Sequence, residues 1–311
     1  MLSDILKTYK LNTDFNHLGF YESKEIMQVA DNLKEYIRLG HFVALTGPVG
    51  AGKTTLLRKV KSDLQKTKSY IVSECQTIEK ERVSLSSVVQ AIYLDFNEKI
   101  EKERESRDRK LLQLIEKSSR KVVFFIDDAH NLHFKTLTAL KILVERGLSL
   151  VLVGHPKLHF TLSRGIMEEI GLRCEGIEMQ GLVGEVELYL EWVIAQARGQ
   201  STIFSPEAKE EIALLCRTPL QVKRIAWEAI KQAYEEGEKQ VSRETILNVI
   251  APDFTDLRTE LKRLGYTARD ISSDYNFSLK QVNRFLDGKL PSDDPDSKQI
   301  ATFLKTVGIR F

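Results

Sequence analysis

Short apolar runs alternate with helical segments between Phe42 and Met179. A strand that is apolar at consecutive positions is buried on both faces, as the strands of a parallel sheet are. Helices between such strands return the chain to the starting edge of the sheet, so the alternation predicts a doubly wound α/β domain. The runs are rich in Val, Ile, Leu and Phe, and they are Phe42–Leu45, Tyr70–Val72, Val122–Ile126, Leu148–Val153 and, more weakly, Gly176–Met179.

Helical periodicity dominates on both sides of this alternation. Ahead of it, a lead-in loop is followed by apolar residues at helical spacing from Ile26 to Ile37. From Leu182 to Val249 the pattern is helical throughout, and Ser205 followed by Pro206 is typical of a helix start.

A break at Ala251-Pro252-Asp253 separates this helical region from a C-terminal tail of short helices. We therefore expect three parts: an α/β core with its lead-in (1–181), a helical subdomain (182–250) and a small all-α C-terminal module (254–311).

The composition narrows the partners only slightly. With 46 Lys and Arg against 44 Asp and Glu, the net charge of +2 gives no global basic field, so any nucleic-acid surface must be local. No apolar run approaches the roughly 20 residues that span a bilayer, and Met1–Lys10 lacks a signal-peptide core. The three cysteines are far apart, which favours a reducing compartment over disulfides or zinc. We expect a cytoplasmic protein without membrane contact.

The segment from Gly47 to Thr54, GPVGAGKT, fits the pattern G-x-x-x-x-G-K-[ST] in full. It lies between the strand Phe42–Leu45 and a helical run, Thr55–Leu64, which is the context the motif requires. The glycines let successive N–H groups turn toward phosphate oxygens, and the helix N-terminus adds partial positive charge. We expect Lys53 to reach the β- and γ-phosphates of ATP and the Thr54 hydroxyl to ligate Mg²⁺. The residues expected to bind the nucleotide are Gly47, Pro48, Val49, Gly50, Ala51, Gly52, Lys53, Thr54 and Thr55.

Two carboxylates end the apolar run Val122–Ile126. In a parallel sheet this places them at the carboxyl edge, beside the phosphates. Asp127 is expected to hold Mg²⁺, and Asp128 to orient or deprotonate the attacking water. The alternative is a helix over Ala129–Leu140 with Asp128 as its N-cap; next to a P-loop, the catalytic interpretation is favoured.

With these two motifs the sequence resembles the AAA+ ATPases. The resemblance implies that His155, at the position of the family's polar sensor residue, contacts the γ-phosphate or the water; a plain turn histidine before Pro156 is the alternative. It also implies that Arg173 is an arginine finger for the neighbouring subunit, with Arg164 in reserve and a surface arginine as the alternative. The residues expected to act in catalysis are Lys53, Asp128, His155 and Arg173.

Two departures from the family pattern favour a nucleotide-controlled switch with slow hydrolysis. The family usually has Asp-Glu where this chain has Asp127-Asp128, and the shorter side chain holds the water less well. In the second sensor region, Leu220 and Gln221 occupy the place usual for an arginine, and Lys223 or Arg224 is the candidate substitute.

The stretches IDDAHNL and LVLVGHPKL look like one branch of the family, with the resemblance covering Asn12 to Ile250. This branch contains the transposition ATPases TnsC, TniB and the phage Mu B protein, and the ExeA-type secretion ATPases. It implies an ATP-dependent regulator that oligomerises as a ring or helical filament on double-stranded DNA, selects target DNA and recruits or activates a transposase, together with a targeting protein. The alternatives are an ExeA-like secretion-associated ATPase and a helicase loader or replication initiator.

The tail Thr267–Leu286 has the pattern of a helix–turn–helix and resembles the lambda-repressor-like module of the Mu B protein. The expected core residues are Ala268, Ile271, Phe277, Val282 and Phe285, supported by Ile300, Phe303, Leu304 and Val307. The side chains expected to face DNA are Ser278, Lys280, Gln281 and Arg284. A packing or protein-docking module is the alternative.

A second nucleic-acid surface is expected in the loop Gln76–Ser87, because loops after the second strand contact DNA in transposition ATPases. Its cations Lys80 and Arg82, with Ser84 and Ser86, suit backbone phosphates. The alternative is an ordinary solvated loop.

Overall fold

The structure is a computed structural model, and it describes residues 1–75, 83–129, 132–162, 174–249, 257–275, 277–291 and 294–306. The chain forms two compact units. The sheet unit comprises Glu22–Gly47 and Lys53–Met179, and the helical unit comprises Met1–Tyr21, Pro48–Gly52 and Gln180–Phe311.

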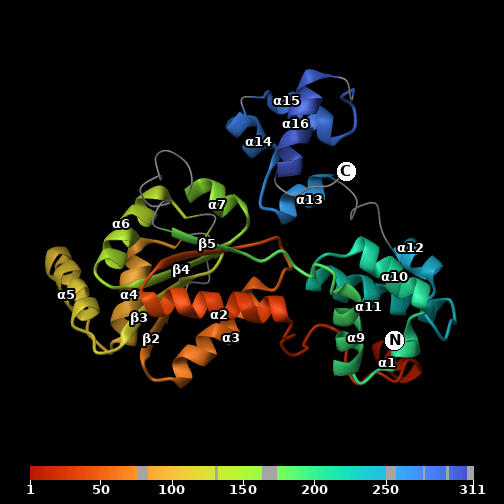
Figure 1. The fold of residues 1–311 in the computed structure, drawn as a ribbon, viewed down its shortest axis with the longest axis horizontal. Coiled ribbons are helices and arrows are strands. Elements are labelled where there is room, and N and C mark those ends of the chain that lie inside the picture. Colours follow the sequence, from red (N-terminus) through yellow and green to blue (C-terminus); the bar gives the residue numbers. More distant parts are fainter. Residues whose placement is uncertain are drawn as a thin grey trace. The chain divides into compact units, whose positions relative to one another are not determined.

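Within the described residues, the sheet unit is built on five parallel strands in the order β2-β3-β4-β1-β5 (Figure 1). All five overlap the predicted apolar runs, and β1 and β4 are buried at every position. The parallel α/β prediction is therefore confirmed, including the weak fifth strand. The strands are β1 (Phe42–Thr46), β2 (Tyr70–Glu74), β3 (Lys121–Ile126), β4 (Ser149–Gly154) and β5 (Cys174–Glu178).

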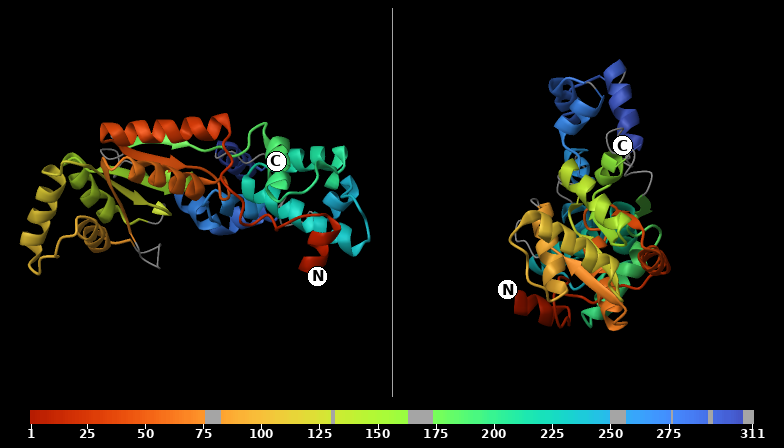
Figure 2. Two further views of the ribbon diagram at one scale, coloured as in Figure 1. Left: turned by 90° about the horizontal axis from the view of Figure 1, so that it is seen from below. Right: turned by 90° about the vertical axis from the view of Figure 1, so that its left-hand side faces the viewer.

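Helices cover both faces of this sheet. On one face α2 (Lys24–Leu39) and α3 (Lys53–Lys66) contact each other, and α2 runs alongside the strands (Figures 1 and 2). Because parallel crossovers are right-handed, the helices after β2, β3 and β4 lie on the opposite face. These are α4 (Leu85–Asp95), α6 (Phe134–Glu145) and α7 (Lys157–Leu162), with α5 (Arg104–Glu116) against α4. The stretch from Asn97 to Ser106 is exposed and rich in charged residues, and it ends in the first turn of α5.

The register of the strands determines which residues meet at the carboxyl edge of the sheet. Thr46 at the end of β1 pairs with Gly154 of β4, and Ile126 at the end of β3 pairs with Leu152. The residues that follow β1, β3 and β4 therefore meet at one carboxyl edge of the sheet.

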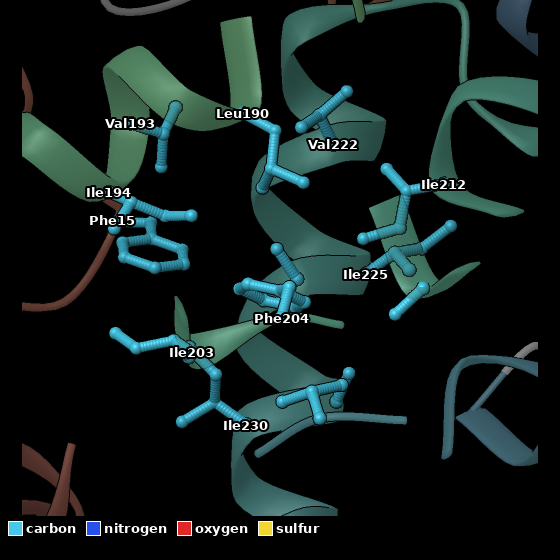
Figure 3. Close-up of a cluster of buried hydrophobic side chains, with 14 of the residues drawn as sticks. Phe15, Leu190, Val193, Ile194, Ile203, Phe204, Ile212, Val222, Ile225 and Ile230 are labelled. Atoms are coloured by element: carbon cyan, nitrogen blue, oxygen red, sulfur yellow. The ribbon is translucent and has the colours of Figure 1, made fainter. Parts of the chain in front are cut away.

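The helical unit packs around a core of apolar side chains (Figure 3). Ser205 and Thr218 accept hydrogen bonds as N-caps, each followed by proline at the first helical position. This confirms the helix start expected at Ser205. The elements are α9 (Val186–Gln196), a 3₁₀ turn (Ser201–Ile203), α10 (Pro206–Leu215), α11 (Pro219–Glu235) and α12 (Arg243–Val249).

The first residues of the chain belong to this helical core, whereas the sequence pattern grouped them with the sheet. They include a helix that the pattern did not show, α1 (Leu2–Thr8). Phe15 is 1% exposed, lies beside Ile194 in Figure 3 and meets Trp227 edge-on with ring centroids 5.5 Å apart. Asn12 N donates to Ala197 O at 2.9 Å, so Met1–Tyr21 is an integral layer of the helical unit.

The described part of the C-terminal module has four helices around its own apolar cluster. Ile271, Val282 and Ile300 are fully buried, and Tyr266 meets Phe303 edge-on at 5.6 Å. The expected core residues Ala268, Phe277 and Phe285 are partly buried against it, and Val307 lies outside the described residues. The helices are α13 (Leu257–Arg263), α14 (Ala268–Tyr275), α15 (Leu279–Leu286) and α16 (Pro295–Thr306).

Among the described residues, every helix is too short or too polar to cross a membrane.

Candidate nucleotide-binding site

The loop between β1 and α3 is shaped by glycines at positions where a side chain would not fit. A Cβ atom on Gly47 would lie 2.4 Å from Met179 O, just after β5. Gly50 and Gly52 have φ values of +81° and +99°, in the left-handed region that other residues avoid. The loop therefore takes a curled form whose main-chain amides can turn toward an anion at the start of α3.

Lys53 is the first residue of α3, and its side chain folds back over the loop. Its Nζ donates to Gly47 O at 2.7 Å. Burial lowers the pKa of Lys53 to about 8, although Asp127 and Asp128 act in the opposite direction. A cation that is desolvated in this way gains strongly from a phosphate partner.

Thr54 and Asp127 come together at the carboxyl edge. Thr54 Oγ1 donates to Asp127 Oδ2 at 2.9 Å, and Asp127 Oδ1 accepts from Asp128 N at 3.0 Å. Adjacent oxygens around an octahedral Mg²⁺ with bonds of 2.0–2.1 Å are about 2.9 Å apart. The two oxygen atoms are thus already spaced as neighbouring magnesium ligands, and the residues fit the metal.

Asp128 has a left-handed backbone, with φ of +57°. The helix α6 begins at Phe134, and its N-cap is His133, whose Nδ1 accepts from Lys135 N at 3.2 Å. The α-helix expected over Ala129–Leu140 therefore starts later than predicted, and residues 130 and 131, which follow the turn at Ala129, lie outside the described residues. Asp and Asn are the non-glycine residues that adopt this conformation most readily, which accounts for a short carboxylate here.

One protein family is similar to part of the chain. Residues 37–162, which run from the end of α2 to α7, match the family described as the AAA domain. No curated protein sequence matches the chain.

Solved structures share the fold over nearly the whole chain. The Aeropyrum pernix ORC2 protein in its ADPNP–ADP complexes is 12% identical, with 95% of this chain and 88% of that chain covered and a TM-score of 0.54. The Drosophila ORC bound to DNA is 14% identical, with 98% and 83% covered and a TM-score of 0.53. A RuvB mutant from Thermotoga maritima is 14% identical, with 94% and 98% covered and a TM-score of 0.50. At these identities the similarity is one of fold: an AAA+ α/β domain followed by a helical part.

Of the other residues predicted to act at this site, the structure describes His155 but not the two candidate arginine fingers. His155 follows β4 at the same carboxyl edge and is half-buried, and its carbonyl accepts from Leu158 N at 2.9 Å at the start of α7. This position suits both the sensor and the turn interpretation. Arg164 and Arg173 lie outside the described residues, as do Lys80 and Arg82.

The serines of the second-strand loop have a local role. Ser84 is the N-cap of α4, and it exchanges hydrogen bonds with Ser87. Ser86 is exposed in the first turn of the helix.

The first turn of α11, Pro219 to Val222, contains no arginine. Gln221 Oε1 accepts from Arg217 N at 2.8 Å and Thr218 N at 3.1 Å, which closes a capping box. The pKa of Lys223 is lowered by burial, with Asp14 opposing the shift. Sequence reasoning missed that Leu220 contacts the phosphate loop; no single-residue signal marks this contact.

The four side chains expected to face DNA from the C-terminal module fall into two pairs. Ser278 and Gln281 form the capping box of α15, and Gln281 Nε2 also donates to Asp296 of α16. Both are therefore engaged within the module. Lys280 and Arg284 lie exposed on one face of α15, with Arg284 Nη2 3.4 Å from Lys289 O.

Proposed function

We propose that this protein is an ATP-dependent, oligomerising switch that binds double-stranded DNA and regulates DNA transposition in the cytoplasm. The observation that carries the proposal is the pairing of Thr54 with Asp127 beside the buried ammonium of Lys53. Buried polar groups of this kind are stabilised by a triphosphate and its metal.

The roles of the residues follow from their positions. Main-chain amides of the loop and Lys53 would hold the phosphates, and Thr54 with Asp127 would hold Mg²⁺. Bound Mg²⁺ supplies charge neutralisation at the β- and γ-phosphates. Asp128 would accept the proton of the attacking water, as a general base on the residue next to the metal ligand.

Hydrolysis is expected to be slow. The carboxylate of Asp128 is one methylene shorter than the glutamate usual in AAA+ proteins, and its backbone is held in a conformation that suits Asp better than Glu. A long-lived ATP state favours a switch over a motor. ATP would then favour assembly on DNA, with Arg173 reaching the neighbouring subunit's nucleotide, and hydrolysis would release the assembly.

Transposition is favoured by the resemblance of IDDAHNL and LVLVGHPKL to the transposition ATPases, which pair an ATPase with a helical DNA-binding module. The partners would be a transposase and a targeting protein. A second candidate, a replication initiator or helicase loader, is favoured by the shared fold with an ORC protein that is described as bound to DNA.

The experiment is an electrophoretic mobility shift on random-sequence duplex DNA with ATP, ADP or no nucleotide. We expect a shift with Mg²⁺–ATP, a weaker one with ADP, and loss of the ATP effect in Lys53→Ala. Lys66→Ala, a 72% exposed lysine in the last turn of the same helix, is the matched control. Binding that is equal or absent under all three conditions would contradict the proposal.

A transposase and a replicative helicase offered as competing baits then separate the two candidates. ATP-dependent retention by the transposase supports transposition. Retention by the helicase alone supports the second candidate.

A further inference from the structure

The first turn of α11 contacts the phosphate loop through its main chain. Leu220 N donates to Gly50 O at 3.3 Å. Leu220 is the second residue of the helix, where N–H groups have no acceptor inside the helix. Gly50, Thr218 and Leu220 belong to the same compact unit.

Packing allows only glycine on the loop side of this contact. A Cβ atom at Gly50 would lie 2.5 Å from Leu220 Cβ and 3.1 Å from Thr218 Oγ1. Leu220 Cδ2 would also lie 3.1 Å from that Cβ atom, so the leucine side chain, which is half-exposed, packs against Gly50 beside the main-chain hydrogen bond.

The two ends of one peptide group in the loop have different partners. Gly50 O accepts from Leu220 N, and Ala51 N donates to Pro48 O at 3.2 Å. Gly50 O and Ala51 N belong to one rigid planar unit, so neither can turn without the other. If Ala51 N–H turns from Pro48 O toward a phosphate, Gly50 O must rotate away from Leu220 N.

We propose that α11 senses nucleotide through the Gly50–Ala51 peptide, with the Leu220 amide as the receiving group. This inference rests on the proposed binding of ATP. Leu220 and Gln221 occupy the place in the second sensor region where AAA+ proteins usually have an arginine. The main-chain N–H of Leu220 would take over the sensing role of that arginine. Binding of phosphate breaks the hydrogen bond between Leu220 and Gly50 and loosens the first turn of α11.

The test is hydrogen–deuterium exchange of the full chain, followed in the peptide Arg217–Trp227 with and without Mg²⁺–ATP. A hydrogen bond of ordinary strength corresponds to a roughly two- to tenfold change in exchange. We expect first-turn exchange in the unaltered protein to become faster by that factor when ATP binds.

Leu220→Pro removes the N–H donor at a first-turn position where proline is tolerated. This variant should bind ATP but show no ATP-dependent change in the peptide. The matched control is Glu207→Pro, since α10 begins with the same arrangement of capping hydroxyl, proline and second helical residue. Glu207→Pro and Leu220→Ala, which keeps the N–H, should both respond as the unaltered protein does.

Each opposite result overturns the inference: exchange that is unchanged or slower when ATP is bound, a full response in Leu220→Pro, or a lost response in Leu220→Ala. The wild-type and Leu220→Ala results decide the matter even if Leu220→Pro fails to fold. ATP binding is measured by titration in the same buffer. Absence of binding to the unaltered protein would overturn the proposed function as well, whereas binding without a response in α11 overturns this inference alone.

Discussion

The phosphate loop and the C-terminal module use their polar groups in opposite ways. In the loop, glycine conformations curl the main chain so that its amides can turn toward a ligand, and Lys53 is buried with a depressed pKa. In the module, the amide side chain of Gln281 is bonded to Ser278 and Asp296, and Arg258 donates to Asn283 and Asp287 of α15.

The difference concerns what each region can recognise. The loop is arranged for a ligand that brings negative charge, so its affinity and chemistry depend on a few buried groups. The polar side chains that cap helix α15 form hydrogen bonds within the module. The cations Lys280 and Arg284 are exposed on the same helix and can bind a partner. We therefore expect strong effects from changes in the loop and modest, salt-dependent effects from changes in α15.

The largest effect is expected for Asp128→Asn. Removal of a general base lowers turnover by about 10²- to 10⁴-fold, while ATP binding is retained because Lys53 and the loop are unchanged. Single-turnover hydrolysis measures the rate, with the distant surface variant Asp108→Asn as control. Unchanged turnover would show that Asp128 is not the base.

The pH dependence of ATP affinity is the next largest effect. In the protein without nucleotide, the pKa of Lys53 is about 8. Below that pH the ammonium is charged and binding is at its strongest; above it, ATP must bind together with a proton, so affinity falls by up to about tenfold per pH unit. Titrations from about pH 7 to 9.5 check the sign. Lys53→Arg keeps its charge at these pH values, so its ATP affinity should show no such fall. An equal fall in both proteins would mean that a group other than Lys53 causes the pH dependence.

A smaller effect is expected for the cations of α15. Lys280→Ala and Arg284→Ala should each reduce the slope of log affinity for DNA against log salt by about 1. The change should be similar for different duplex sequences, because phosphate contacts carry no sequence information. Fluorescence anisotropy at several salt concentrations measures this slope. An unchanged slope in the double variant would show that this face of α15 does not bind DNA.

The smallest effect is expected for Gln281→Ala. Loss of the capping box should lower the free energy of unfolding of the C-terminal module by about 1 kcal/mol, with little change in DNA affinity at a temperature where the module is folded. Thermal unfolding and anisotropy together check this. A large loss of DNA affinity without loss of stability would show instead that Gln281 contacts the bases directly.

These differences explain how far the sequence could be interpreted alone. The placement of Gly47–Thr54 beside Asp127 was predictable, because the motif specifies main-chain conformation and a parallel sheet brings the ends of its strands together. Contacts between residues that are distant in sequence were not predictable. Phe15 packs on Trp227, Gln281 reaches Asp296 and Gly50 meets Leu220, and no local pattern reports such pairs. The same limit assigned Met1–Tyr21 to the sheet when its partners lie in the helical unit.

Calorimetric titration of Mg²⁺–ATP into the full chain and into Lys53→Ala measures whether the phosphate loop binds the nucleotide. We expect saturable binding at one site per chain, weakened about 10- to 100-fold in the variant by the loss of charge-assisted hydrogen bonds to phosphate. Absence of binding to the unaltered chain, or equal affinity of the two proteins, would contradict it.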